Sequence, residues 1–174
     1  MARQPNTFGG GAQTNINGLT FERDMDLLMV INTLPNFQTV GNHILFNGNL
    51  VAKHFSKYGL YNDYLISNHI NWQDYIYSRL LPDDVLITQQ ACYIIEKKFQ
   101  NVAGSVDEKL TTFDFKTQQY QKMFAPLDKQ VYFYYLLSDW FQQPKYRDHL
   151  QYIRDNQADY FFNVADLLNR IVWE

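Results

Sequence analysis

The residues best suited to chemistry in this 174-residue chain are acids and lysines at the ends of two short apolar segments. Pro82-Asp83-Asp84 opens the first segment, and Glu96-Lys97-Lys98 closes the second. Side chains two positions apart in an extended strand share one face, so Glu96 and Lys98 point to the same side. An isolated E-x-K is usually a surface ion pair, but here it follows a buried strand, with Pro-Asp a short way upstream. The pattern therefore predicts a carboxylate and an ammonium held side by side.

A second carboxylate can reach the first if the two segments are neighbouring strands. Such strands run about 4.8 Å apart, so Asp83 or Asp84 would converge with Glu96 on one divalent cation. Oxygen ligands suit a hard ion such as Mg²⁺, which keeps waters available. That ion can polarise a phosphoryl oxygen and activate a water. Lys98 would orient the water or neutralise charge in the transition state.

The elements that must position these groups alternate between helix and strand. Val131 to Leu137 is aromatic or aliphatic throughout, as in a central strand covered on both faces. We predict a single α/β domain over residues 1–174, with a central mixed sheet flanked by helices and residues 1–10 as a flexible arm. The expected helices are 19–33, 105–126 (with a Ser105/Glu108 capping box), 145–155 and 164–171; the expected strands are 38–46, 85–87, 92–95 and 131–137; residues 49–77 are expected to be short helix and loop.

Composition limits the class of protein. The chain is 46% hydrophobic and 17% aromatic, which excludes a disordered segment. A net charge of −3 counts against a nucleic-acid binder, which tends to be basic. However, a site that uses a metal ion on a phosphoryl group must concentrate acids, and a bound Mg²⁺ reverses the local sign of charge. The motif therefore outweighs the net charge.

The remaining bulk features predict an intracellular protein. The single Cys92 excludes an intramolecular disulfide framework, and no stretch has the 18–20 or so apolar residues of a membrane span. We expect a cytoplasmic protein without a membrane contact. No G-x-x-x-x-G-K-[ST] motif is present, so no nucleotide cofactor is expected.

The central motif resembles that of a known group of enzymes. Pro82-Asp83 followed by Glu96-Lys97-Lys98 is similar to the P-D…(D/E)-x-K signature of the restriction-endonuclease-like nucleases. The predicted element order also resembles the core of that superfamily. IIEKKFQNVAGSVDEKL (94–110) and GGGAQTNINGLTFE (9–22) resemble prokaryotic type II restriction endonucleases, so the resemblance covers about residues 9 to 140.

The resemblance implies roles for individual residues. Asp83 and Glu96 would be metal ligands and Lys98 the catalytic lysine. Asp84 competes for the place of the first ligand, because sequence alone does not fix strand register. Glu22 matches a further acidic residue that the family often places near the site, and a helix-stabilising first-turn acid is the alternative.

Three other residues are candidates for substrate contact or support. Gln100 falls on the same side of the extended chain as Lys98, although an ordinary strand-end residue is the favoured interpretation. Lys53 and Lys57, with His54, form a small basic cluster that could meet a phosphate backbone, and a solvated helix face explains it nearly as well.

The leading hypothesis is a Mg²⁺-dependent endonuclease that cleaves double-stranded DNA, of the type II restriction class and acting as a homodimer. A two-fold DNA site needs one active site per strand, which favours a dimer. The alternatives are a repair or structure-specific nuclease with the same core, and a non-catalytic DNA-binding or assembly module.

Overall fold

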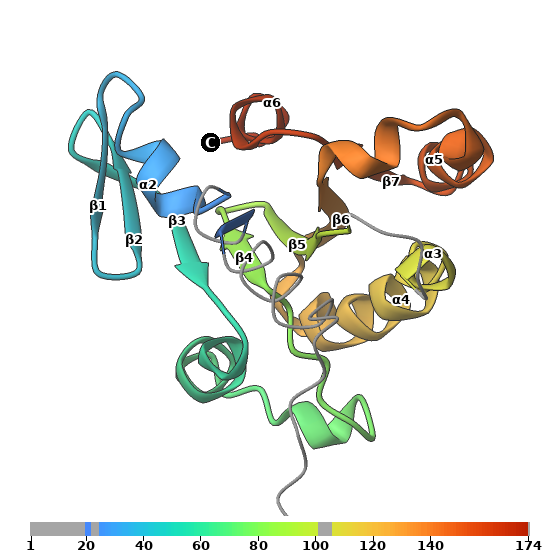
Figure 1. Ribbon diagram of the computed structural model, residues 1–174. Coiled ribbons are helices and arrows are strands. Elements are labelled where there is room, and N and C mark those ends of the chain that lie inside the picture. The colour runs from blue at the N-terminus through green and yellow to red at the C-terminus, as the bar shows by residue number, and fades with distance from the viewer. Residues whose placement is uncertain (1–19, 22–24, 101–105, 174) are drawn as a thin grey trace, which may run out of the picture.

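A seven-stranded mixed β-sheet organises the computed structural model, which describes residues 20–21, 25–100 and 106–173 (Figure 1). The strands lie in sequence order across the sheet. Neighbours from the first to the fifth strand are antiparallel, whereas the fifth, sixth and seventh run parallel. The strands are β1 (Phe37–Val40), β2 (His43–Phe46), β3 (Asn49–Phe55), β4 (Asp84–Ile87), β5 (Ala91–Lys98), β6 (Gln130–Leu137) and β7 (Ala158–Phe161).

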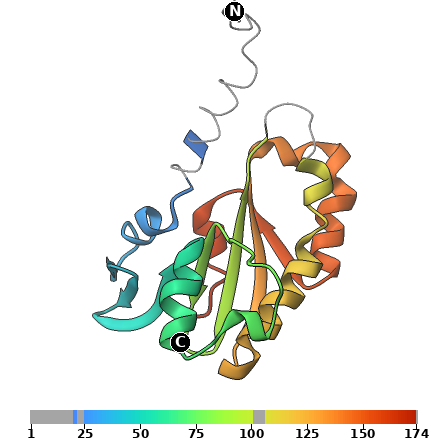
Figure 2. The same ribbon diagram turned by 90° about the horizontal axis from the view of Figure 1, so that it is seen from below.

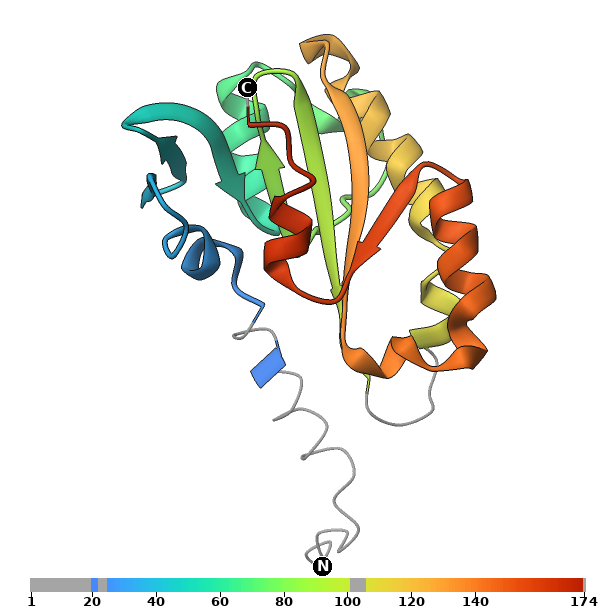
Figure 3. The ribbon, with the colours of Figure 1, turned by 90° about the horizontal axis from the view of Figure 1, so that it is seen from above.

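Helices cover both faces of this sheet. One face, here called the front face, lies under α4 (Phe113–Phe124) and a π-helical segment, Leu60–Leu65 (Figure 2). The back face lies under α2 (Leu27–Ile31) and α6 (Val164–Leu168) (Figure 3). The other helices are α3 (Val106–Lys109) and α5 (Arg147–Asp155), and the short 3₁₀ turns are Trp72–Asp74, Ala125–Leu127, Asp139–Gln142 and Pro144–Tyr146. The structure thus confirms the predicted α/β class with a mixed sheet between helices.

The three central strands β4, β5 and β6 are buried because their side chains pack into cores on both faces. On the front face, Ile94 and Phe133 pack with Tyr120 of α4. On the back face, Tyr93 and Leu136 pack with residues of α2 and α6. Continuous apolar sequence is what a strand covered on both sides requires, and burial of this area is the main stabilising contribution.

The β4–β5 hairpin has a defined register. Asp84 pairs with Ile95, and Ile87 pairs with Cys92 at the turn end. The turn carbonyls of Thr88 and Gln89 each accept a hydrogen bond of 2.7 Å from the ammonium group of Lys129. The two central strands and their tight connection are therefore as predicted, and their pairing fixes which side chains share a face.

The strands on either side of the central three differ from the prediction. The expected strand 38–46 is a hairpin, β1–β2, because Gly41 adopts a positive φ of 58° between them. Residues 49–55 form strand β3 rather than short helix and loop. Strand β7 was not predicted; it is a four-residue edge strand parallel to β6.

All four expected helices are shorter than predicted or divided: α5 begins at Arg147 instead of residue 145, and α6 ends at Leu168 instead of residue 171. The predicted helix 105–126 is divided into α3 and α4, because the hydroxyls of Thr111 and Thr112 bond back to the carbonyls of Glu108 and Lys109 where the chain turns. Helix α2 begins only at Leu27, after an N-cap carboxylate on Asp26. Ser105, half of the expected capping box, and the expected arm 1–10 lie outside the described residues.

No helix within the described part of the chain is both long enough and apolar enough to cross a membrane.

Candidate active site

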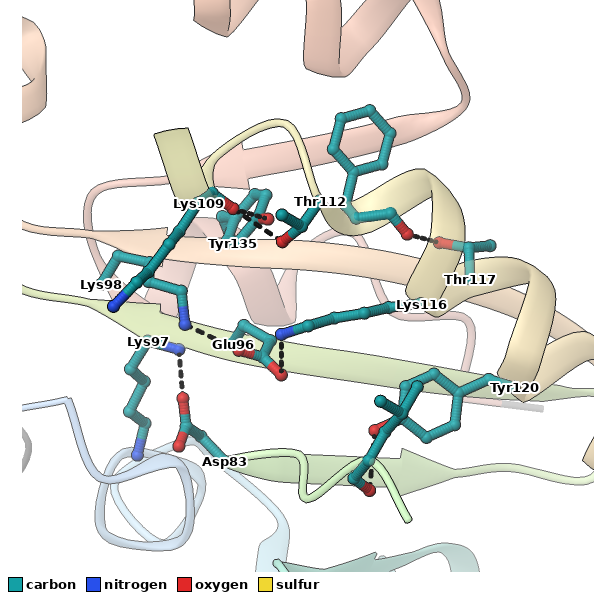
Figure 4. A network of polar contacts seen from close by, with 12 residues as sticks. Asp83, Glu96, Lys97, Lys98, Lys109, Thr112, Lys116, Thr117, Tyr120 and Tyr135 are labelled. Carbon is teal, nitrogen blue, oxygen red and sulfur yellow. Dashed lines mark hydrogen bonds and ion pairs between the residues drawn. The ribbon is translucent and has the colours of Figure 1, made fainter. Parts of the chain in front are cut away.

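The buried carboxylate of Glu96 forms ion pairs with two lysines on the front face, near the carboxyl end of β5. Glu96 is only 5% exposed. Its Oε2 accepts a hydrogen bond of 2.6 Å from Lys98 Nζ. Its Oε1 lies 3.0 Å from Lys116 Nζ of α4 (Figure 4). The side-by-side placement of Glu96 and Lys98 agrees with the alternation expected of a strand.

Asp83 lies beside Glu96, immediately before β4. The register that pairs Asp84 with Ile95 brings Asp83 to the level of Glu96 on the neighbouring strand. Asp83 Oδ2 accepts a hydrogen bond of 2.8 Å from the backbone N–H of Lys97, so the carboxylate is tied to β5 (Figure 4). The two acids therefore lie at the same level of the sheet, Glu96 on β5 and Asp83 immediately before β4.

Lys57 holds Asp83 from the other side. Its ammonium group forms an ion pair with Asp83 Oδ1, and its backbone N–H donates a 2.9 Å bond to the carbonyl of Pro82. Lys57 has a φ of 46°, in the left-handed region that turns the chain after β3. The residue thus fixes both the backbone and the carboxylate of the Pro-Asp segment.

Asp84 belongs to a different cluster on the back face. Its Oδ1 lies 2.7 Å from His54 Nε2 of β3, and its Oδ2 lies 2.8 Å from Lys97 Nζ. Burial alone would raise the pKa of the Asp84 carboxyl, but the His54 contact and the Lys97 charge outweigh it and hold this pKa below its usual value. The fold therefore groups Asp83, and not Asp84, with Glu96 and Lys98.

Two buried tyrosines, on α4 and β6, form hydrogen bonds that connect the elements around Asp83, Glu96 and Lys98. The Tyr120 hydroxyl of α4 donates to the Leu80 carbonyl at 3.2 Å, and the Tyr135 hydroxyl of β6 donates to the Lys109 carbonyl at 3.1 Å (Figure 4). Burial raises the pKa of both hydroxyls, so they stay protonated donors. These bonds tie α4 to the segment before Pro82, and β6 to α3.

Gln100 lies just beyond the end of β5, and its side chain is buried. The backbone N–H of Gln100 donates to Ser138 Oγ at 3.2 Å, and the Ser138 hydroxyl donates back to the Gln100 carbonyl at 3.1 Å. This reciprocal pair joins the chain after β5 to the chain after β6. Gln100 thus lies two residues after Lys98, and its role in substrate contact or support stays a prediction.

The basic cluster expected on a helix face is on a strand instead. Lys53 and His54 are adjacent in β3, so they point to opposite faces. Lys53 pairs with Ile87 near the turn end of β4, away from Glu96. Of the predicted basic residues, Lys57 alone contacts Asp83. The predicted ligand Glu22 lies outside the described residues.

Lys116 was missed by the sequence reasoning, and His54 was given a different role. Lys116 falls three residues after Phe113 and four before Tyr120, which are both buried, so it is a cation on the apolar stripe of α4. That position was a usable signal. His54 was expected in a phosphate-binding basic cluster; its contact with Asp84 had no signal in the sequence, because that contact depends on the pairing of β3 with β4.

The donor set fits a hard divalent cation. Asp83 and Glu96 offer carboxylate oxygens, and Mg²⁺ is commonly held by one or two carboxylates while it keeps several waters. Among the described residues, no three side chains of the His, Cys, Asp and Glu types gather closely enough to form a fuller site. Asp83 and Glu96 are therefore the residues that would hold the ion.

Comparison with known proteins agrees with this geometry. Residues 43–126 match the family model described as the PD-(D/E)XK nuclease superfamily domain. The matched segment runs from β2 through α4 and contains Asp83, Glu96, Lys98 and Lys116. No curated protein and no solved structure matches the chain at a significant level.

Proposed function

Because the chain carries a nuclease domain of the PD-(D/E)XK superfamily, we propose that it is a Mg²⁺-dependent endonuclease with Asp83, Glu96 and Lys98 at its active site. The observation that carries the proposal is the placement of Lys98 Nζ 2.6 Å from Glu96, beside Asp83 on the next strand. The proposed domain is the whole chain, 1–174, since β6 and β7 extend the sheet that contains the matched segment.

Asp83 and Glu96 would hold the metal ion between adjacent strands. A divalent ion held by these residues would polarise a phosphoryl oxygen and make a water more acidic. Their own positions are set in advance: Asp83 by Lys57 and the Lys97 N–H, and Glu96 by two ammonium groups. Such preorganisation avoids the cost of orienting the ligands when substrate binds.

Lys98 would act on the scissile phosphate group directly. Its ammonium group is a mobile point charge that can orient the attacking water or stabilise the charge that grows on the phosphate oxygens. Its stem leaves β5 on the side where Glu96 lies, so ligand and lysine face one substrate position. Lys116, from α4, would supply a second positive charge there.

The more specific part of the proposal is a type II restriction enzyme that acts on double-stranded DNA as a homodimer in the cytoplasm. The resemblance of residues 94–110 to such enzymes supports the class. A two-fold DNA site requires two active sites, which supports the dimer. The single cysteine, Cys92, allows no intramolecular disulfide, which supports an intracellular location.

The test is incubation of the full chain with plasmid DNA and Mg²⁺, followed by mapping of the cut sites. We expect discrete fragments that disappear with a chelator and return with added Mg²⁺. Glu96→Gln, which keeps the shape but removes the charge, should be inactive, whereas Lys122→Ala on the exposed side of α4 should cut normally.

Each alternative has its own outcome in this assay. Cleavage only at mismatches, ends or branches would replace the restriction role with repair. Retention of DNA in a gel shift, without metal-dependent cleavage by wild-type protein, would replace the enzyme with a binding module. Equal cutting by wild type and Glu96→Gln would overturn the site assignment.

A further inference from the structure

A polar cavity of about 690 Å³ opens on the back face of the sheet, near the amino ends of β5, β6 and β7. Tyr93 and Tyr132, paired across β5 and β6, contribute to its wall. Tyr93 precedes Glu96 by three positions and points to the opposite face, so the cavity is separate from the proposed nuclease site. The lining residues are Tyr93, Tyr132, Tyr134, Arg154, Gln157, Ala158, Asp159, Arg170 and Val172.

Tyrosine rings form the inner wall of this cavity. The rings of Tyr93 and Tyr132 are stacked with centroids 5.2 Å apart and planes inclined by 15°, and Tyr134 lies 5.7 Å from Tyr93. Tyr93 and Tyr134 are buried, whereas Tyr132 is only partly buried. An aromatic face that is supported from behind is a suitable platform for a planar ring.

Two arginines lie at the mouth and share one acid. Arg154 Nε, from α5, lies 3.1 Å from Asp159 Oδ1, and Arg170 Nε, after α6, lies 3.9 Å from Asp159 Oδ2. The guanidinium of Arg154 also lies 4.2 Å above the Tyr160 ring, which helps to hold its orientation.

The charge of the lining is therefore positive. Two arginines against one aspartate leave one net positive charge, and more than half of each arginine side chain is exposed. Both contacts with Asp159 run through Nε, at the side of the guanidinium group. Planar guanidinium groups bind phosphate through paired N–H donors, so this mouth suits a phosphate group.

We propose that this cavity binds a nucleotide, with its phosphate at Arg154 and Arg170 and its base against Tyr132. The volume lies within the roughly 300–1,000 Å³ typical of small-molecule sites. The ligand is either a free nucleotide or the terminal nucleotide of a strand, since both present a base next to a phosphate. The proposal goes beyond the nuclease function, because none of the proposed catalytic residues lines the cavity.

The test is calorimetric titration of the full chain in EDTA, so that no cleavage occurs. The probes are a nucleoside 5′-monophosphate, the matching nucleoside and inorganic phosphate. We expect the monophosphate to bind at least about tenfold more tightly than either part alone, because only it uses both the tyrosine wall and the arginines. Oligonucleotides with and without a 5′-phosphate identify the source: tighter binding of the phosphorylated oligonucleotide than of the monophosphate indicates a strand end, and the reverse indicates a free nucleotide.

Variants locate the binding. Arg154→Gln/Arg170→Gln should weaken monophosphate binding by about tenfold or more, while the matched control Arg79→Gln, another exposed arginine, should not. Tyr132→Leu should lower the affinity for the monophosphate to that for inorganic phosphate. This single variant tests the same cavity if the double arginine variant does not fold.

Three results would overturn the proposal. One is the absence of saturable binding at millimolar monophosphate. Another is equal affinity of monophosphate and phosphate for the wild type, which would show only a weak anion site. The third is loss of binding in Glu96→Gln with retention in Arg154→Gln/Arg170→Gln, which would move the ligand to the nuclease site.

Discussion

The two faces of the β4–β5 hairpin each carry a cluster of one buried carboxylate and two basic side chains, but the surroundings of the two clusters differ. On the front face, Glu96 is shared by Lys98 and Lys116. On the back face, Asp84 is shared by His54 and Lys97. Each cluster places one buried carboxylate between two basic groups from different elements.

The difference lies in what surrounds each carboxylate. On the front face, Asp83 adds a second acid on the neighbouring strand, next to Glu96, so two carboxylates can meet one ligand. On the back face, Asp84 has two basic partners and no second acid among the described residues. The comparison teaches that adjacent residues in this sequence belong to different clusters: Asp83 lies next to the proposed metal ligand Glu96, and Asp84 links β3, β4 and β5.

The largest effect should follow from breaking the back-face cluster. Asp84→Ala leaves Lys97 and His54 facing each other without a carboxylate, and breaking a buried pair costs about 3–5 kcal/mol of unfolding free energy. Asp83→Ala should cost less, since the Asp83 side chain is more exposed, at 23% against 9%. Urea denaturation of both variants measures this difference, and equal losses of unfolding free energy would contradict the distinction between a structural Asp84 and a less structural Asp83.

The next effect is a difference in cleavage rate between variants of two adjacent lysines, Lys97 and Lys98. Lys98→Ala should lower the cleavage rate by about a hundredfold to a thousandfold, as loss of one stabilising charge at a reacting group does. Lys97→Ala removes a positive charge from the back face instead. Its cleavage rate should stay within about tenfold of the wild-type rate. Rates are measured on plasmid DNA at a temperature where both variants are folded; a reversed order would exchange the roles of the two faces.

A smaller effect concerns acid stability. The pKa of the folded Asp84 carboxyl lies below its ordinary value of 3.8, so its ionised form stabilises the fold above that value. This contribution should be lost as pH falls below 3.8 and through the lower folded pKa. Unfolding free energies of wild type and Asp84→Asn, measured between pH 6 and pH 2, should therefore converge toward the acid end. A constant difference would show that the carboxyl does not titrate as described.

The smallest effect is expected at the second lysine of the front face. Lys116→Ala leaves Glu96 with Lys98, so cleavage should fall by less than about tenfold, or about 1.4 kcal/mol. Lys122→Ala, on the exposed side of the same helix, serves as its control. If Lys116→Ala is as inactive as Lys98→Ala, the two lysines act as one unit.

The centre of the fold was predictable because its sequence is unambiguous. Strands β4, β5 and β6 are continuous apolar runs, which a two-sided core requires. Strand β3 was missed because it contains Asn49, Lys53 and His54, whose polarity conceals the apolar pattern of a half-buried strand between β2 and β4. Strand β7 was missed because four residues are too few to show a period, and its position depends on pairing with β6.

The site was predictable to the extent that it is local. Glu96 and Lys98 share a face through the two-residue period of a strand, which sequence alone provides. The choice between Asp83 and Asp84 depends on the register of β4 against β5, and a shift of one residue would reverse it. The roles of these residues stay predictions until cleavage is measured.

The hairpin register has a further consequence for folding kinetics. Asp83 and the Lys97 N–H that holds it are 14 residues apart in the sequence, whereas Gln100 and Ser138, at the other border of the site, are 38 apart. Contacts of short sequence separation close with little loss of chain entropy and form early. The two acids can therefore be aligned before α4 and β6 dock, and the turn at residues 88–90 governs how fast the chain acquires its proposed ligand pair.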